Sequence, residues 1–317
     1  NRPLSMNVAI LGAGPAGMSC ANACLSFGLT PLVIEHAAHA GGAQRSNFHS
    51  NLWLLGAPDE SGQALTQRLV AHYATLNVRT RYQTDVTSAQ RTATGIELTL
   101  TGPAGATTET VEAVVIATGM RPYATPALIA LATHSPRVLI GPLNDTIRDD
   151  IRAARVLILG GGDNALDHAL FLAERGNRVT VATRGTYCGR ESLLAACRAC
   201  PEITLLPHCP LRDLNANARG VQATLGEDPA SFDWLLVMYG YRPNTELLHD
   251  FALELQPALT SGGHLIVDAW QRTSVVGLYA AGDVTETVQP AIPTAMAQGL
   301  AAAKAIERDG KAGRLKG

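Results

Sequence analysis

Apolar runs of strand length alternate with longer stretches whose apolar positions recur at helical spacing. Runs of four to eight apolar residues between glycine or charged positions predict buried strands, and spacings of three and four predict helices. In the first third of the chain this pattern predicts the following elements: a strand–helix–strand unit over 6–36, an irregular segment over 41–56, a helix over about 62–76, and a β-meander over 78–86, 95–101 and 107–116.

The same alternation returns after a stretch, 122–150, that we expect to be rich in loops. The elements predicted there are strand 155–160, helix 163–175, strand 178–183, helix 191–199, strand 203–207, strands 220–225 and 233–239, and a small-residue helix over about 293–307. Strands that alternate with helices pair in parallel. The pattern therefore predicts an α/β fold with two parallel sheets.

A glycine motif follows the first predicted strand and opens the first helix. It reads Gly12-Ala13-Gly14-Pro15-Ala16-Gly17. Its glycines suit a tight turn, a close backbone approach to a pyrophosphate and close packing of helix on strand. The next strand ends at Glu35, where a carboxylate can accept both ribose hydroxyls. The alternative is a glycine turn without a ligand. With strand, helix and acid all present, we expect FAD here.

A second glycine motif, Gly160-Gly161-Gly162-Asp163-Asn164-Ala165, follows the strand predicted at 155–160. Its next strand ends at Thr183 and Arg184 rather than at an acid. An acid there favours NAD, whereas an arginine favours the 2′-phosphate of NADP. Arg190 is a candidate second phosphate partner, although both arginines can also be solvated surface charges. The sequence thus predicts NADPH at this motif.

Composition and charge narrow the class of protein. The chain has 317 residues, enough for two domains, with 46% hydrophobic residues, 16% charged residues and a net charge of −2. No basic field indicates nucleic acid. No apolar run indicates a signal peptide or a membrane span, so we expect a cytoplasmic protein. Its six cysteines are then expected to be free thiols, and none completes a recognisable metal pattern.

The two motifs, together with Gly41-Gly42, Ala117-Thr118-Gly119 and Gly282-Asp283-Val284, resemble the low-molecular-weight thioredoxin-reductase-like flavoproteins over essentially the whole chain. This resemblance implies two Rossmann-like, three-layer ββα domains, with the NADPH domain inserted into a discontinuous FAD domain. The FAD domain would comprise 1–121 and 242–317, and the NADPH domain 122–241. The resemblance also implies a homodimer formed through the FAD domain.

Site residues follow from the motifs and from this resemblance, which places Asp283 at the ribityl chain and the backbone of Ala291 and Ile292 at the pyrimidine edge of the flavin. The FAD positions are Gly12, Gly14, Pro15, Ala16, Gly17, Glu35, His36, Gly42, Gln44, Val86, Thr118, Gly119, Gly282, Asp283, Ala291 and Ile292. The NADPH positions are Gly160, Gly162, Asp163, Asn164, Ala165, Thr183, Arg184 and Arg190.

One departure from the family bears on function. True thioredoxin reductases carry a redox Cys-x-x-Cys just before the second motif, and the matching residues 138–146 contain no cysteine. The chain has one such spacing, at Cys197 and Cys200, late in a predicted helix. Active dithiols usually lie at the amino end of a helix, where the dipole lowers the thiol pKa. Two free helical thiols are the expected interpretation; a working dithiol is the alternative.

We therefore expect an FAD-dependent oxidoreductase that passes electrons from NADPH to an external acceptor of ferredoxin or flavodoxin type. The related ferredoxin/flavodoxin–NADP reductases also lack the dithiol, but they often add an aromatic C-terminal segment that is missing here, so quinones and small molecules stay open as acceptors. The alternatives are a disulfide reductase and a low-turnover redox-sensing flavoprotein. No general acid is expected. Gln44, His49 and Trp53 either line the acceptor side or pack as ordinary loop residues.

Overall fold

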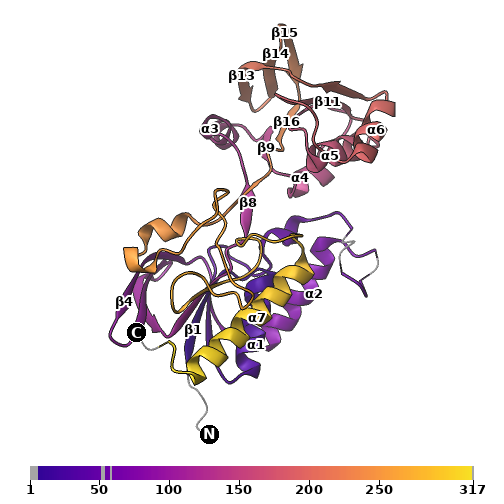
Figure 1. The fold of residues 1–317 in the computed structure, drawn as a ribbon. Helices are drawn as coiled ribbons and strands as arrows, with labels where there is room; N and C mark the ends of the chain where they lie inside the picture. The colour runs from indigo at the N-terminus through magenta and orange to yellow at the C-terminus, as the bar shows by residue number, and fades with distance from the viewer. Residues whose placement is uncertain (1–5, 51–53, 58, 316–317) are drawn as a thin grey trace. The chain divides into compact units, whose positions relative to one another are not determined.

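The computed structural model describes residues 6–50, 54–57 and 59–315. The chain divides into two compact units (Figure 1). The first unit comprises 1–121 and 243–317, and the second comprises the continuous segment 122–242. The predicted boundaries at 121/122 and 241/242 lie within one residue of these. Each unit is described separately below.

A five-stranded parallel sheet forms the centre of the first unit. Its strands, in spatial order, are β18 (Leu278–Ala280), β7 (Ala113–Ile116), β1 (Asn7–Leu11), β2 (Thr30–Ile34) and β3 (Arg79–Arg81). The central strands β1 and β7 are buried on both faces, which explains their unbroken apolar runs. Their carboxyl ends lead into the first glycine motif and into Ala117-Thr118-Gly119.

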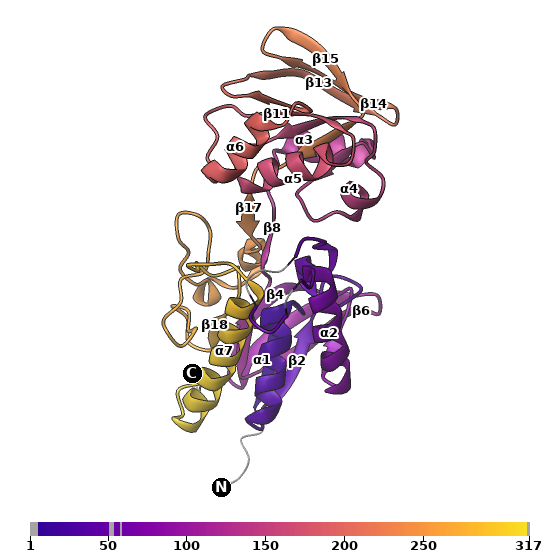
Figure 2. The ribbon, with the colours of Figure 1, turned by 90° about the vertical axis from the view of Figure 1, so that its right-hand side faces the viewer.

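Different layers cover the two faces of this sheet. Val8 and Ile10 of β1 point into a core shared with the helices α1 (Pro15–Ser26), α2 (Gly62–Thr75) and α7 (Ile292–Lys311). Figure 2 shows α1 between α7 and α2. Ala9 and Leu11 point the other way, into a core shared with the antiparallel strands β4 (Asp85–Thr92), β5 (Gly95–Gly102) and β6 (Gly105–Val111). This alternation produces three layers.

The second unit repeats the arrangement. Its parallel sheet has the order β12 (Ile203–Leu206), β11 (Arg178–Ala182), β10 (Arg155–Leu159), β16 (Trp234–Val237) and β9 (Val138–Ile140). Helices α5 (Asp163–Ala173) and α6 (Glu191–Ala199) pack on one face. On the other face an antiparallel sheet is formed by β13 (Leu211–Asn217), β14 (Gly220–Leu225) and β15 (Asp228–Phe232). The predicted fold class, with two Rossmann-like three-layer units, is confirmed.

The two segments that join the units run side by side, since β8 (Met120–Pro122) pairs with β17 (Tyr241–Pro243). Three 3-10 turns complete the first unit: η1 (Gly42–Ser46), η2 (Glu246–Asp250) and η3 (Leu253–Leu255). Within the described ranges, no helix is both long enough and apolar enough to cross a lipid bilayer.

Several predicted boundaries were wrong. The run 78–86 divides between β3 of the parallel sheet and β4 of the meander, and 107–116 divides in the same way between β6 and β7. The stretch 122–150, expected to be loop, holds α3 (Pro126–His134), β9 and α4 (Asp145–Asp149). These elements are short, and sequence periodicity identifies short elements poorly. Helix α7 extends four residues past its predicted end, to Lys311.

Candidate dinucleotide sites

The first glycine motif forms a turn that only small residues can occupy. Gly12 has φ +110°, and a Cβ there would lie 2.4 Å from the carbonyl oxygen of Ala117. A Cβ on Gly17 would lie 1.9 Å from the carbonyl oxygen of Gly12. Helix α1 then begins with Pro15 at its first turn, and among the described residues no side chain caps its amino end. Its free N–H groups and dipole therefore favour an anionic group at Gly14.

Glu35 is held beside this turn by the main chain. The N–H of Ala13 donates to its Oε2 (N–Oε2 2.6 Å), and the N–H of Ala37 donates to its Oε1 (N–Oε1 2.8 Å). Each carboxylate oxygen accepts more than one hydrogen bond. The side chain is thus fixed in orientation while keeping acceptor capacity for the two hydroxyls of a ribose.

The segment after β2 folds over the same turn. The N–H of Gly41 donates to the carbonyl of Ala13 (2.8 Å), and a Cβ on Gly42 would lie 3.1 Å from Cα of Gly14. Among the described residues, a Cβ on Gly14 itself would meet only Gly42, at 3.9 Å, so its face of the turn is open there. Gly14 and Gly42 thus form a bare backbone cradle at the amino end of α1. This arrangement fits the pyrophosphate of a dinucleotide.

The side chain of Asp283 is a second indication that a ligand binds beside the glycine turn. The carboxylate is half-buried, and no hydrogen-bond donor reaches it within the described part of the chain. Burial raises the pKa of Asp283, and the nearby His264 opposes that rise only in part. Buried polar groups ordinarily have partners. An acceptor left without a donor beside the glycine cradle fits a hydroxylated chain such as the ribityl group of FAD.

The remaining predicted FAD positions border these groups. Gly282 packs against Ala16, since a Cβ on Gly282 would lie 2.9 Å from Cβ of Ala16, and Ala291 and Ile292 begin α7. His36 Nδ1 donates a hydrogen bond to Oδ1 of Asp85 (2.7 Å), next to Val86 on β4, and this contact raises the pKa of His36.

Two further predicted positions, besides Glu35 and His36, are engaged with other protein groups. The Thr118 hydroxyl donates to the Asn244 carbonyl (2.7 Å), and Gln44 Oε1 accepts from Asn47 Nδ2 (2.7 Å). Asn244 in return donates to the Thr118 carbonyl (Nδ2–O 2.8 Å). The loop at Thr118 and Gly119 is therefore held from the far end of the inserted segment.

The second motif reproduces the first in outline. Gly160 has φ +148°, and a Cβ there would lie 2.3 Å from the Met238 carbonyl oxygen. Gly162 precedes α5, whose amino end again lacks a side-chain cap, while Ala165 is buried in the first turn. Its exposed neighbours Asp163 and Asn164 begin the helix. The turn fits a pyrophosphate, although the acid at Asp163 has no counterpart in α1.

The two predicted phosphate partners differ in their surroundings. Arg190 is bound to Asp163, with Nε donating to Oδ2 (2.7 Å) and its N–H donating to Oδ1 (2.7 Å). Arg184, next to Thr183 at the end of β11, is exposed and lies over the ring of Tyr239, 5.8 Å from its centroid. Arg190 therefore neutralises the helix acid, whereas Arg184 keeps its charge available.

The Cys-x-x-Cys pair is poorly placed for redox chemistry. Cys197 is fully buried in the last turn of α6, where its thiol contacts the Leu166 carbonyl (Sγ–O 3.4 Å), and burial raises its pKa to about 11. Cys200 caps the carboxyl end of the same helix, and its pKa is raised as well, mainly by burial. All six cysteines are free thiols. A thiolate is disfavoured at both positions.

Residues 6–299 match the family of pyridine nucleotide-disulphide oxidoreductases. The chain belongs to this family. A ferredoxin–NADP reductase of Limosilactobacillus fermentum is 30% identical over 87% of this chain and 85% of its own length. A protein of Pseudomonas fluorescens named glucosaminate ammonia-lyase is also 30% identical, over 95% of this chain and 94% of its own.

The solved structures of this oxidoreductase family agree with the fold. The crystal structure of thioredoxin reductase from T. acidophilum superposes with a TM-score of 0.79 at 23% identity, covering 97% of this chain and 99% of that one. The expected resemblance to thioredoxin-reductase-like and ferredoxin–NADP-reductase-like proteins is confirmed. The nucleotide contacts of individual residues stay predictions.

Some contacts around these sites were missed from the sequence. Gln298 of α7 accepts the N–H of Gly282 through Oε1 (2.7 Å), and Asn244 supports Thr118 as described above. The available signal for Gln298 was a polar residue within the stretch 295–303, whose other residues are small or apolar. Of the candidates for the acceptor side, His49 stacks near Phe48 (centroids 4.3 Å apart), whereas Trp53 lies outside the described residues.

Proposed function

We propose that the chain is an NADPH-dependent FAD oxidoreductase that passes electrons to an external acceptor. The first unit would bind FAD and the second NADPH, because each presents a bare glycine turn at an uncapped helix end. The assignment of FAD to the first unit rests on Glu35 and on the unpartnered Asp283. The assignment of NADPH to the second rests on Arg184 in place of an acid.

The protein groups would bind and orient rather than exchange protons. FAD, when bound, supplies the chemistry that takes a hydride equivalent from NADPH and releases electrons to the acceptor. Glu35 would accept the ribose hydroxyls and Asp283 a ribityl hydroxyl. The amino end of α7 at Ala291 and Ile292 carries the positive end of a helix dipole, which favours negative charge nearby.

The positions of the two cysteines support an external electron acceptor. A disulfide reductase of this family needs a dithiol, and Cys197 and Cys200 lie at the wrong end of α6 with raised pKa values. A small redox protein of ferredoxin or flavodoxin type is therefore the proposed acceptor, in line with the name of the Limosilactobacillus fermentum relative. We further propose that two copies associate through the FAD-binding unit.

A panel of acceptors tests this proposal. The purified flavoprotein is reduced with NADPH or NADH under anaerobic conditions, and reoxidation is followed with ferredoxin, flavodoxin, thioredoxin and quinones. Fast reduction by NADPH and turnover with ferredoxin or flavodoxin are expected. Turnover with thioredoxin alone would contradict the proposal, and failure with every acceptor would favour a redox-sensing flavoprotein. Because one relative is named glucosaminate ammonia-lyase, ammonia release from glucosaminate is assayed in parallel.

A further inference from the structure

A groove of about 720 Å³ lies in the second unit, beyond the carboxyl ends of the strands β12, β11 and β16 of the parallel sheet. Arg184 follows β11, His208 follows β12 and Tyr239 follows β16, and all three line the groove. The other wall is apolar and comes from α3 and β13, including Leu128, Leu131, Leu211 and Leu214. Ligands of open α/β sheets bind beyond the carboxyl ends of the strands.

The second glycine turn lies close to the chain that leads to Arg184 at the groove wall. β10, which leads into that turn, pairs with β11, and a Cβ on Gly161 would lie 3.1 Å from Oγ1 of Thr183. Thr183 in turn precedes Arg184. A dinucleotide with its pyrophosphate at Gly162 would therefore extend its adenosine past the end of β11 and into this groove, whose apolar wall suits a purine ring.

The backbone on both sides of Arg184 is fixed. The N–H of Cys209 donates to the Thr183 carbonyl (2.9 Å), and the N–H of His208 donates to the Gly185 carbonyl (3.0 Å). The Arg184 side chain itself forms no ion pair with an acid in the part of the chain that the structure describes. Its contact is the face of Tyr239, 5.8 Å from guanidinium carbon to ring centroid.

The charge of Arg184 acts electrostatically on Tyr239. Burial raises the pKa of Tyr239, and the Arg184 charge opposes that rise. A guanidinium stacks on an aromatic face through both its charge and its plane, which limits the rotamers of a long side chain. Such stacking leaves the N–H donors at the guanidinium edge free for two oxygens of one anion.

We propose that Tyr239 positions Arg184 to bind the 2′-phosphate of an adenine dinucleotide whose adenosine lies in this groove. The inference rests on the proposed function, since it explains how NADPH is distinguished from NADH. Tyr239 is a positioning residue: it acts on the phosphate only through Arg184. Removing its ring takes away the surface on which the guanidinium rests without removing the charge.

Equilibrium binding tests the proposal without flavin chemistry or an acceptor. The holoenzyme is titrated calorimetrically with adenosine 2′,5′-bisphosphate and with 5′-AMP, which lacks the 2′-phosphate. The ratio of the two dissociation constants measures recognition of that phosphate. Wild type should prefer the bisphosphate, and Arg184→Ala should remove the preference. Arg178→Ala, an exposed arginine at the opposite end of β11, is the matched control and should leave the ratio unchanged.

The Tyr239 variants test whether the ring orients Arg184 or only fills space in the groove. Tyr239→Leu and Tyr239→Met both remove the ring, and methionine keeps more of the side-chain length. Each should lower the preference for the bisphosphate about two- to fivefold, the range of an exposed cation–π contact. Tyr239→Phe keeps the ring and should retain the wild-type ratio. In the Arg184→Ala background the same Tyr239 changes should have no further effect on the ratio.

Different results would overturn NADPH recognition and the positioning role of Tyr239. A wild-type protein with no preference for the bisphosphate would overturn both NADPH recognition and the role of Tyr239. A preference that depends on Arg184 but not on Tyr239 would overturn only the positioning role. Equal weakening of bisphosphate and 5′-AMP by Tyr239→Met would show that the ring contacts the adenine instead, which also overturns it.

Discussion

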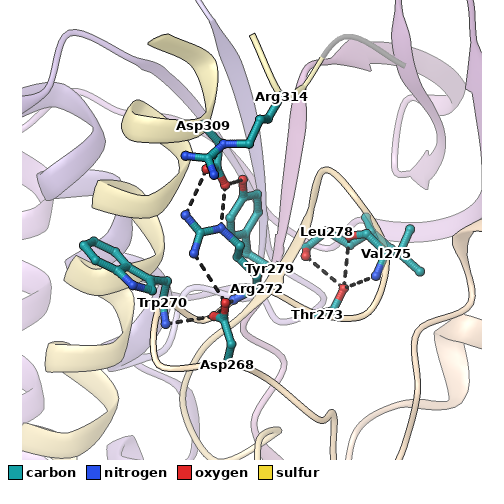
Figure 3. A network of polar contacts seen from close by, with 9 residues as sticks. All are labelled: Asp268, Trp270, Arg272, Thr273, Val275, Leu278, Tyr279, Asp309 and Arg314. Atoms are coloured by element: carbon teal, nitrogen blue, oxygen red, sulfur yellow. Dashed lines mark hydrogen bonds and ion pairs between the residues drawn. The ribbon is translucent and has the colours of Figure 1, made fainter. Parts of the chain in front are cut away.

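Arg272 and Asp309 form a two-pronged ion pair in the first unit, with Nε–Oδ2 at 2.7 Å and Nη2–Oδ1 at 2.9 Å (Figure 3). Asp309 is only 3% exposed, and it also accepts the hydroxyl of Tyr279 (2.7 Å) and pairs with Arg314 (Nε–Oδ1 3.1 Å). The carboxyl end of α7 is thereby tied to β18 and to the loop before it. Since α7 begins at the proposed flavin edge, this network fixes the whole helix.

Asp309→Asn should destabilise the protein by roughly 2–3 kcal/mol. It removes the charged partner of the closest Arg272 contacts and leaves Asp268 (Nη1–Oδ2 3.3 Å), and the loss lies below the usual range for buried pairs because Arg272 is partly exposed and keeps this second acid. Denaturant unfolding of the apoprotein measures the change. Asp250→Asn, an exposed acid of η2, is the control and should have little effect. An unaltered midpoint in Asp309→Asn would mean that the network adds no stability.

We also expect the stability difference between wild type and Asp309→Asn to depend on pH. Burial opposes ionisation of Asp309, but hydrogen bonds from Arg272 and Tyr279 outweigh it, so the pKa of Asp309 lies below its usual value. A carboxylate whose pKa is lowered in the native state stabilises the fold at pH values above its unfolded-state pKa of about 3.9. That stabilisation is lost as the pH falls through the native pKa. The stability gap between wild type and Asp309→Asn should therefore stay constant from pH 7 to 5 and close at lower pH.

Glu35→Gln should weaken FAD binding. The change removes the charge and one of two acceptor oxygens, while the N–H groups of Ala13 and Ala37 still compete for the remaining oxygen. Hydrogen bonds to charged groups contribute about 1–3 kcal/mol, so a loss of roughly fivefold to a hundredfold in affinity is expected. Fluorescence titration of apoprotein with FAD measures it, with the exposed Glu254→Gln as control. Wild-type affinity in Glu35→Gln would remove Glu35 from the site.

Asp283→Asn should have opposite effects on the apoprotein and on FAD binding. Because burial raises the pKa of Asp283, its ionised form lowers stability at every pH above that raised value. The asparagine variant should therefore unfold at a higher temperature than wild-type apoprotein at pH 8, and the difference should shrink as the pH falls through the native pKa of Asp283 and towards its unfolded-state value. FAD affinity should fall, since a charged acceptor is lost. Glu286→Gln, an exposed neighbour, should change neither quantity; stabilisation without weaker binding would place Asp283 outside the site.

The double variant Cys197→Ser/Cys200→Ser should keep turnover with both an artificial and the natural acceptor. Both thiols lie at the carboxyl end of α6, where neither burial nor the helix dipole favours a thiolate. Steady-state NADPH oxidation measures both activities. Intact turnover with the artificial acceptor but none with the natural one would instead support a disulfide reductase.

The sequence predicted the long elements and the two glycine turns because their signals are local. β1 and β10 are unbroken apolar runs, and each is followed by glycines that a Cβ would not allow. The features that the sequence did not predict depend on contacts between distant segments. The pairing of Arg190 with Asp163 joins residues 27 positions apart, and Asn244 reaches Thr118 across 126 positions. The groove at Tyr239 needs three strand ends to meet, which no single run of residues reveals.

Gly299→Ala should destabilise the first unit although alanine favours helices. Gly299 lies within α7 where this helix crosses α1, and a Cβ there would lie 2.2 Å from the Ala16 carbonyl oxygen and 2.9 Å from the Cys20 nitrogen. Both are backbone atoms, so the helices must move apart, and overpacking of this kind costs about 1–3 kcal/mol. Ala16 and Gly282 lie at the same crossing, so separation should also weaken FAD binding.

Leu300→Ala, at an exposed position one residue along, is the control for helix propensity and should keep wild-type FAD affinity. Unfolding and FAD titration of the two variants give the comparison, and a more stable Gly299→Ala protein would show that α7 shifts without cost.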